Sequence, residues 1–196
     1  MIKSTAELVL ELNSYENPYT KIARLVKDNK LFKIKKGIYE TNENVDSFFL
    51  AHVIYGPSYI SFQSALSYYS LIPERVYMVT SATTDKHKTK IINNRFGSFI
   101  YKDVPNAAYS YGIYRVEKDG YVCFMATKEK AICDMLYEYS PVYSIKDLKR
   151  LLFDDLRIDE NEFNKMDFNE MSLIASLYHT TNHKLLIKYL KGKRKC

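Results

Sequence analysis

Cysteine is scarce in this chain, and the cysteines that it has form no pattern. The 196 residues include Cys123, Cys133 and Cys196, which lie far apart and contain no C-x-x-C pair. This spacing excludes a disulfide framework and a zinc finger, and it indicates a reducing compartment. Tryptophan is missing altogether, while Tyr and Phe are plentiful at 18 and 10 residues.

Long hydrophobic runs are missing as well. Met1-Ile2-Lys3 leads into an amphipathic segment and not into the apolar core of a signal peptide. The longest apolar stretch, Phe48 to Tyr55, is interrupted by His52 and is much shorter than the ~20 residues that a membrane-spanning helix needs. We therefore expect a cytoplasmic protein without a membrane partner.

Glycine motifs of enzymes are absent too. The six glycines are dispersed, so the chain has no P-loop, no GxGxxG and no GxSxG. Asp154-Asp155 resembles the carboxylate pair with which a nucleotidyltransferase holds Mg²⁺, but no glycine turn lies nearby and neighbouring residues of a helix point apart. We expect no catalytic residue, no cofactor and no enzymatic activity.

The four histidines are scattered and predict no metal site. His179 and His183 have the i, i+4 spacing of a metal-binding pair on one helix. The residues between them, Thr180-Thr181-Asn182, are more typical of a helix break followed by a new cap. His52 lies in an apolar helical segment, where we expect a hydrogen-bonded core histidine.

Positive charge is what the chain has in excess. The formal net charge is +6 and the isoelectric point is about 9.0, which fits a polyanionic partner. Basic residues concentrate in residues 18–36, 86–102 and 184–196, whereas residues 154–170 hold seven acidic residues against two basic ones. The acidic zone is either the exposed side of helices or a surface for a cationic partner.

The first basic zone has the pattern of a helix with one cationic side. Asn17 is a suitable N-cap and Pro18 a suitable first residue. At about 100° per residue, the polar side of the helix collects the residues that we expect to face the major groove of DNA: Thr20, Lys21, Arg24 and Lys27. The opposite side is apolar and can dock on a preceding helix within residues 4–13.

The helix is followed by a predicted hairpin with one cationic face. In residues 31–35 the period changes to two, with Phe32 and Ile34 on one face. Gly37 can supply the positive φ of the turn before the second strand, residues 38–40. The cationic side chains that we expect on the DNA backbone are Lys33, Lys35 and Lys36. The alternative is a solvated basic face on a small helical domain.

The rest of the chain predicts a second, larger region. Residues 41–44 are a polar connector, and after it helices are expected over 46–55, 62–70, 127–137, 145–153, 161–166, 171–178 and 182–191. Strands are expected over 75–81, 91–94, 95–101, 111–118 and 121–125, the last two joined by an Asp119-Gly120 turn. The predicted fold class is α+β: a reduced winged helix-turn-helix domain (1–45) with two helices where three are usual, then a mixed α/β domain (46–196) with a helical C-terminal half.

Three segments together resemble the AbiEi family of antitoxins from type IV toxin–antitoxin and phage-defence operons. They are KGIY at residues 36–39, YISFQSALSYYSLIP at 59–73 and TKEKAICD at 127–134, in the order that they have in the family. Tyr69-Ser70 stands where the family commonly has His-Gly. The resemblance implies an N-terminal winged helix that binds repeats in its own promoter and represses the operon. It also implies a C-terminal domain that counters a nucleotidyltransferase-like toxin, without a stable complex.

Residues in these segments also have a purely structural interpretation. Ser61 and Ser64 suit a helix cap and first turn, and Glu129 suits the first turn of a later helix. Asp134 lies among apolar neighbours and suits a buried hydrogen-bond anchor. These residues would then define the fold and not a chemistry.

A second basic cluster lies on a β-rich loop and is our candidate for the antitoxin surface: Lys86, Lys88, Lys90 and Arg95. A solvated loop is the alternative. The competing hypothesis for the whole chain is a single-stranded RNA-binding or protein-interaction module without antitoxin activity, because abundant Tyr beside basic zones can stack bases. Against it, the aromatic residues do not alternate with the basic run of residues 18–36 and fall mostly in predicted strands and core helices.

Overall fold

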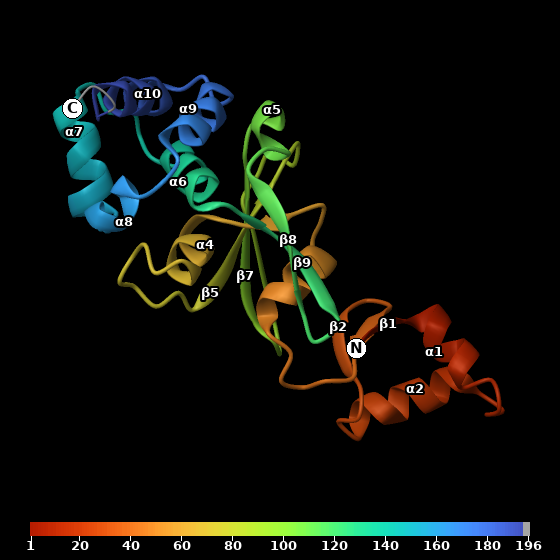
Figure 1. The fold of residues 1–196 in the computed structure, drawn as a ribbon. Coiled ribbons are helices and arrows are strands. Elements are labelled where there is room, and N and C mark those ends of the chain that lie inside the picture. The colour runs from red at the N-terminus through yellow and green to blue at the C-terminus, as the bar shows by residue number, and fades with distance from the viewer. Residues whose placement is uncertain (194–196) are drawn as a thin grey trace.

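The computed structural model describes residues 1–193, and it is a mixed α+β fold with a three-stranded and a six-stranded sheet (Figure 1). Cys196 and the end of the last basic zone lie outside the described residues. The first 50 residues form β1 (Ile2–Ser4), α1 (Thr5–Glu11), α2 (Pro18–Lys27), β2 (Phe32–Lys35), β3 (Ile38–Glu40) and the 3-10 turn η1 (Ser47–Leu50).

The middle of the chain alternates strands with short helices. Its elements are α3 (Ala51–Ile54), β4 (Tyr59–Ile60), α4 (Phe62–Tyr68), β5 (Met78–Thr83), β6 (Lys90–Asn94), β7 (Gly97–Asp103), α5 (Asn106–Tyr109), β8 (Ile113–Lys118) and β9 (Tyr121–Ala126). The remainder is helical: α6 (Lys128–Tyr137), α7 (Ile145–Arg150), the π-helical turn η2 (Leu151–Asp155), α8 (Glu160–Asn164), α9 (Phe168–Ser176) and α10 (Thr181–Lys193). The predicted helical C-terminal half is confirmed.

The small sheet belongs to an N-terminal unit with its own core. Its strands are antiparallel in the order β1-β3-β2, and Leu8, Ile22 and Leu31 form a separate buried cluster beside it. The two predicted helices are present, and Ser4 and Glu7 close α1 with a capping box. The sequence did not predict β1, because three residues are too short to show an alternating pattern.

The large sheet has the order β6-β7-β5-β4-β9-β8. It is mixed, since β5 pairs in parallel with β7 and β4 with β9, while the outer pairs are antiparallel. The predicted Asp119-Gly120 hairpin is confirmed, with Lys118 opposite Tyr121. The two-residue strand β4 was not predicted, although it lies at the centre of the sheet.

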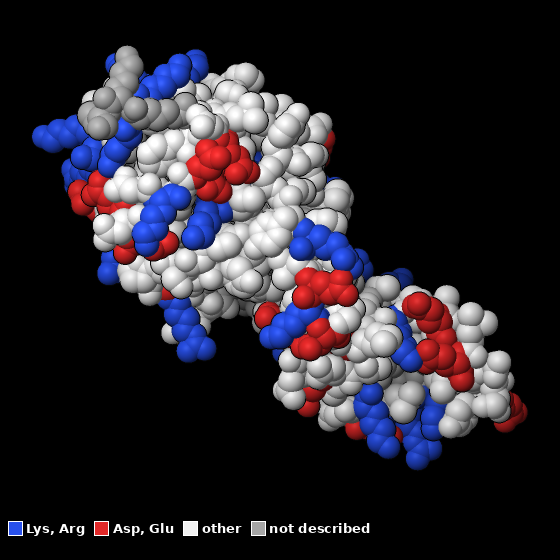
Figure 2. Space-filling model, in the orientation of Figure 1, with Lys and Arg blue, Asp and Glu red and all other residues white. Residues whose placement is uncertain are grey.

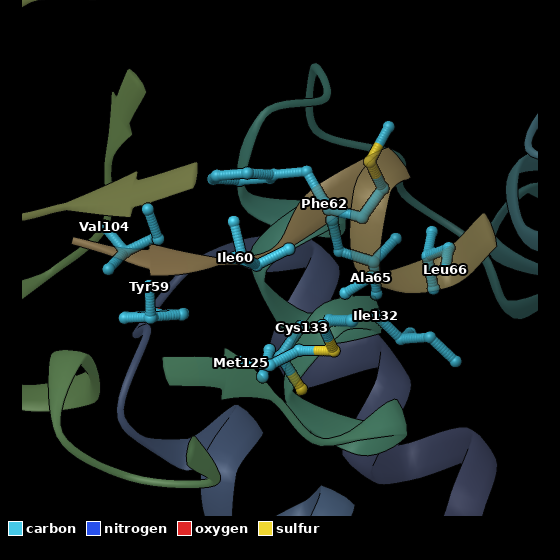
Figure 3. Packing of buried hydrophobic residues seen from close by; sticks show 14 of the residues in the cluster. Tyr59, Ile60, Phe62, Ala65, Leu66, Val104, Met125, Ile132 and Cys133 are labelled. Carbon is cyan, nitrogen blue, oxygen red and sulfur yellow. The ribbon is translucent and has the colours of Figure 1, made fainter. Parts of the chain in front are cut away.

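Helices α4 and α6 pack against each other, and α4 also packs against β5 of the large sheet. Figure 3 shows Ile60, Ala65 and Leu66 packed against Met125 and Ile132 in this core, and all five side chains are at most 1% exposed. The predicted helix over 46–55 is instead a 3-10 turn followed by the single turn α3. Asp46 caps the 3-10 turn by accepting a hydrogen bond from Phe48 N–H.

The N-terminal unit lies at one end of the molecule and the C-terminal helices lie at the other (Figure 1). The exposed segment of residues 41–44 connects the N-terminal unit to the rest. Side chains also join the two parts, because Tyr121 in β9 donates a hydrogen bond to the buried Glu40 at 2.8 Å and the Asn94 amide donates one to the Ile34 carbonyl at 3.4 Å. The N-terminal unit is thus docked on the ends of the large sheet.

Candidate nucleic-acid interface

Helix α2 begins with the cap that the sequence predicted. The Asn17 Oδ1 atom accepts a hydrogen bond from the Thr20 N–H at 3.1 Å, and Pro18 takes the first helical position, where its missing N–H costs nothing. After the helix, Asn29 adopts a left-handed φ of 52° and turns the chain toward β2. The result is a rod of 10 residues, about 15 Å long.

One side of α2 is buried and the other is cationic. Ile22 packs into the small core, whereas Thr20, Arg24 and Lys27 are exposed. The side chain of Arg24 is 77% exposed, and its contact with Asp28 is long, at 3.8 Å between Nε and Oδ2. An exposed pair of this kind contributes below ~1 kcal/mol, so Arg24 can exchange it for a phosphate or a base.

Lys21 differs from the other cations of α2. It is half-buried, and its Nζ atom lies 4.4 Å from the centre of the Tyr15 ring in a cation–π contact. The rings of Tyr15 and Tyr19 are themselves 46% and 65% exposed. The start of α2 therefore offers aromatic faces next to its positive charges.

The hairpin has the two predicted faces. Phe32 and Ile34 are buried, and the three lysines on and after β2 are exposed: Lys33, Lys35 and Lys36. A register shift between Lys33 and Lys35 bulges the strand. Gly37 has a φ of +79°, and its carbonyl accepts a hydrogen bond from Thr5 N–H at 2.8 Å. The turn is thereby fixed against the start of α1.

Charges are segregated on the N-terminal unit. Figure 2 shows Lys and Arg side chains projecting from the edge where α2 runs, while acidic side chains cover the part formed by α1. Lys3 on β1 forms an ion pair with Glu11, at 2.6 Å between Nζ and Oε2. The acids of α1 are therefore partly neutralised within the unit, and the α2 edge keeps its positive potential.

The second basic cluster does not form one patch. Lys86 and Lys90 are half-buried with their Nζ atoms 5.6 and 4.3 Å from the centre of the Tyr55 ring, and Lys88 is exposed. Arg95 lies past the other end of β6, with its guanidinium 4.2 Å from the Phe32 ring and 2.5 Å from Glu43 Oε1. The three lysines therefore lie on or next to the loop before β6. Arg95 lies apart from them and contacts the N-terminal unit and its connector.

A buried polar network joins residues of the segments 59–73 and 127–134. Its centre is Asp134 in α6, which is fully buried and accepts hydrogen bonds from Ser61 Oγ at 2.5 Å and from Tyr59 OH at 3.0 Å. Tyr178, which follows α9, also donates to it. The expected role of Asp134 as a buried hydrogen-bond anchor is confirmed.

Ser61 corrects the cap prediction. It occupies the N-cap position of α4, but its hydroxyl bonds Asp134 and makes no cap hydrogen bond. The Thr80 hydroxyl takes its place, because it accepts from Ser64 N–H at 2.9 Å and donates to the Ser61 carbonyl at 2.7 Å. The cap is supplied from β5, which no local pattern could show.

Lys130 is the network residue that the sequence did not predict. It is fully buried, and its Nζ atom lies 3.1 Å from Asp134 Oδ1, 2.7 Å from the Ala108 carbonyl and 2.5 Å from Tyr178 OH. All three partner residues are buried. Glu129, in the first turn of α6 as expected, is nearly buried and accepts a hydrogen bond from Asp167 N–H at 3.1 Å.

His183 is hydrogen-bonded in the structure, whereas His52 is not bonded to any described residue. The predicted helix break is confirmed, because α10 begins at Thr181 and His183 is buried, with ring nitrogens 2.6 Å from Thr180 Oγ1 and 2.9 Å from the Cys133 carbonyl. For His52 the prediction was wrong. It is half-buried, and its imidazole makes no hydrogen bond with any residue of the described part. The sequence could not show this, because the partners of a core histidine come from distant elements.

Other chemistry-bearing residues do not converge. Asp154 and Asp155 are exposed on the π-helical turn. Within residues 1–193, no three His, Cys, Asp or Glu side chains gather closely enough to hold a metal ion. Over the same residues, no helix combines the length and the apolar character that crossing a membrane requires.

No family model matches the chain, and no curated protein is similar to it.

Proposed function

We propose that the chain is a DNA-binding repressor of its own operon and the antitoxin of a type IV toxin–antitoxin system in phage defence. The observation that carries the DNA-binding half is the exposed cationic edge of α2 together with the exposed lysines of the hairpin. The toxin-countering half rests on the resemblance of residues 36–39, 59–73 and 127–134 to the AbiEi family.

Two features of the N-terminal unit support the proposal that it is a reduced winged helix. A helix about 15 Å long with one cationic side fits the major groove, and a hairpin beside it can contact phosphates. In this proposal Thr20, Lys21, Arg24 and Lys27 face the groove. The backbone contacts come from the wing: Lys33, Lys35 and Lys36.

The larger region is proposed to act on a nucleotidyltransferase-like toxin without forming a stable complex. Because residues 59–73 and 127–134 build the buried Asp134 network, these two segments serve the fold, and we place the toxin-directed surface elsewhere, among exposed residues. Lys86 and Lys88 on the loop before β6 and Lys90 at the start of β6 remain our candidates, with Arg95 as the residue that docks the N-terminal unit. We propose a cytoplasmic protein that is not itself an enzyme.

One observation favours the RNA-binding alternative. Tyr15 and Tyr19 expose their rings beside Lys21 at the start of α2, and aromatic rings next to cations bind unstacked bases. The two functions differ in the nucleic acid that they prefer, so one competition measurement separates them.

The test measures binding of the full chain to duplex DNA from upstream of its own gene and to single-stranded RNA of the same sequence. We expect tighter binding to the duplex, and we expect Arg24→Ala to reduce the discrimination between this duplex and a scrambled one. Lys146→Ala/Lys149→Ala on α7, which removes two exposed lysines far from the N-terminal unit, is the matched control. Preference for the RNA, lost on Tyr19→Ala, would establish the alternative instead.

The antitoxin half is tested in cells. Co-expression with a nucleotidyltransferase encoded beside this gene should restore growth, and a chain that starts at Asp46 should also restore growth but fail to bind the duplex. Restored growth that requires residues 1–45 would contradict a separate toxin-directed region.

A further inference from the structure

An apolar pocket of about 310 Å³ opens on the large sheet. Elements distant in the sequence form it: the loop between α3 and β4, α5, and the strands β8 and β9. Its side chains include Tyr59, Tyr109, Ile113, Phe124 and His52. This size lies within the range of about 300–1,000 Å³ that is usual for small-molecule sites.

Aromatic rings form the walls of the pocket. Tyr59 and Tyr109 lie 5.2 Å apart between ring centres with planes tilted by 57°. Phe124, on β9, leaves 45% of its surface exposed at the pocket, although large apolar side chains gain free energy from burial. A flat aromatic molecule would cover Phe124 and contact the Tyr109 ring with the tilted or offset geometry that such rings prefer, above Tyr59, which is only 2% exposed.

Two polar groups of this pocket lack a partner among the described residues. The His52 imidazole makes no hydrogen bond, and the Tyr109 hydroxyl makes none either. The other two hydroxyls of the lining are already used, because Ser58 donates to the Tyr55 carbonyl at 2.8 Å and Tyr59 donates to Asp134. The unpartnered Nδ1 atom of His52 is itself buried, so a ligand with one hydrogen-bonding group has the other ring nitrogen of His52 and the Tyr109 hydroxyl available.

Positive charge lies beside the pocket. Burial, together with the nearby charge of Lys35, lowers the pKa of His52, so the imidazole is mainly neutral at pH 7 and Lys35 supplies the charge. Arg115 is the cross-strand neighbour of Phe124 in the β8–β9 pair. It pairs with Glu117 at 2.7 Å but stays 57% exposed. This surrounding favours an acidic ligand over a neutral one of the same shape.

We propose that this pocket binds a small planar aromatic acid, with its ring against Tyr109 and Phe124 and its acid group toward His52 and Lys35. A small molecule fits better than a protein segment, because the pocket has a volume of only about 310 Å³, at the lower end of the usual range for small-molecule sites. The proposal does not require the DNA-binding or antitoxin function, although it shares Lys35 with the proposed wing.

The experiment titrates the full chain with 1-naphthoate and follows binding by calorimetry, with naphthalene-1-carboxamide as the neutral probe of the same shape. We expect saturable one-to-one binding of 1-naphthoate and at least about threefold weaker binding of the carboxamide. Absence of saturable binding up to millimolar 1-naphthoate overturns the proposal, and so does equal or tighter binding of the carboxamide.

Variants locate the site. Phe124→Ser removes one wall from a half-exposed position and should weaken 1-naphthoate binding about tenfold, while Ile113→Trp should block the pocket by filling it. Tyr77→Ser, at a ring that is 85% exposed elsewhere, is the matched control and should leave binding unchanged. Circular dichroism checks that each variant is folded.

Two outcomes of the variant series contradict the proposal. One is unchanged 1-naphthoate binding in both folded Phe124→Ser and folded Ile113→Trp, which would place the probe elsewhere. The other is a dimer, detected by sedimentation, that is lost in Phe124→Ser and that 1-naphthoate does not dissociate, because Phe124 would then be covered by a second copy of the chain.

Discussion

Lys130 and Asp134 form an ion pair across one turn of α6, with 3.1 Å between Nζ and Oδ1 and both side chains at 0% exposure. Breaking a buried pair by removing one partner leaves an uncompensated charge. Lys130→Met should therefore lower the free energy of unfolding by about 3–5 kcal/mol, measured by urea denaturation. Lys128→Met, which removes the exposed partner of Glu162 at 3.7 Å, should cost below ~1 kcal/mol. Equal losses in the two variants would contradict the structural role of the network.

This network also shows how far the sequence alone reaches. The cap at Asn17 was predicted correctly, because a cap and its helix are neighbours in the chain. The network depends on pairs far apart, since Asp134 meets Tyr59 and Tyr178 across 75 and 44 residues. Lys130 looks like any surface lysine until those partners are placed.

The same limit applies to the candidate sites. The alternation of Phe32 and Ile34 with lysines predicted both faces of the hairpin, because the pattern is local. Strand β4 and the pocket beside it could not be predicted, since β4 has two residues and the pocket joins α3, α5, β8 and β9. His52 was therefore assigned to a satisfied core position that the tertiary structure does not provide.

His183 should make stability depend on pH. Burial lowers its pKa from 6.5 to about 4, so the folded protein holds the neutral ring and the unfolded chain binds a proton first. The resulting stability is fully present above pH 6.5 and is lost as the pH falls toward 4. At pH 5 the loss is about 2 kcal/mol relative to pH 7. His183→Gln should remove most of this loss in urea denaturation at the two pH values, and an unchanged pH dependence in the variant would disprove the assignment.

Arg95 should hold the N-terminal unit in place. Its guanidinium stacks on Phe32 and pairs with Glu43, and exposed contacts of these two kinds contribute about 1 kcal/mol together. Arg95→Ala should therefore loosen the already exposed connector of residues 41–44 and speed its cleavage in limited proteolysis several-fold. Arg115→Ala, which removes an exposed arginine paired only locally with Glu117 among the described residues, is the control. Identical cleavage of both variants would show that Arg95 does not dock the unit.

Salt dependence should identify the phosphate contacts of the hairpin. If about four to six phosphates are neutralised, the log–log slope of affinity against salt should be roughly −4 to −5. Replacing Lys33, Lys35 and Lys36 by Ala should weaken all duplexes alike and reduce the magnitude of the slope by about 2–3, measured by fluorescence anisotropy. The Lys146→Ala/Lys149→Ala control should keep the original slope. Normal duplex binding by a folded chain without residues 1–45 would refute this interface.

The pocket and the wing should be coupled through Lys35, if both proposals hold. Lys35 is a proposed phosphate contact, and its charge acts on His52 at the pocket. A bound aromatic acid would offset part of that charge, so saturating 1-naphthoate should weaken duplex binding about threefold at low salt, whereas the neutral carboxamide should have little effect. Phe124→Ser should keep duplex binding and lose the response to 1-naphthoate, which separates failure of the pocket from failure of the DNA interface. Equal weakening by 1-naphthoate in the wild type and in Phe124→Ser would rule out the pocket as its origin.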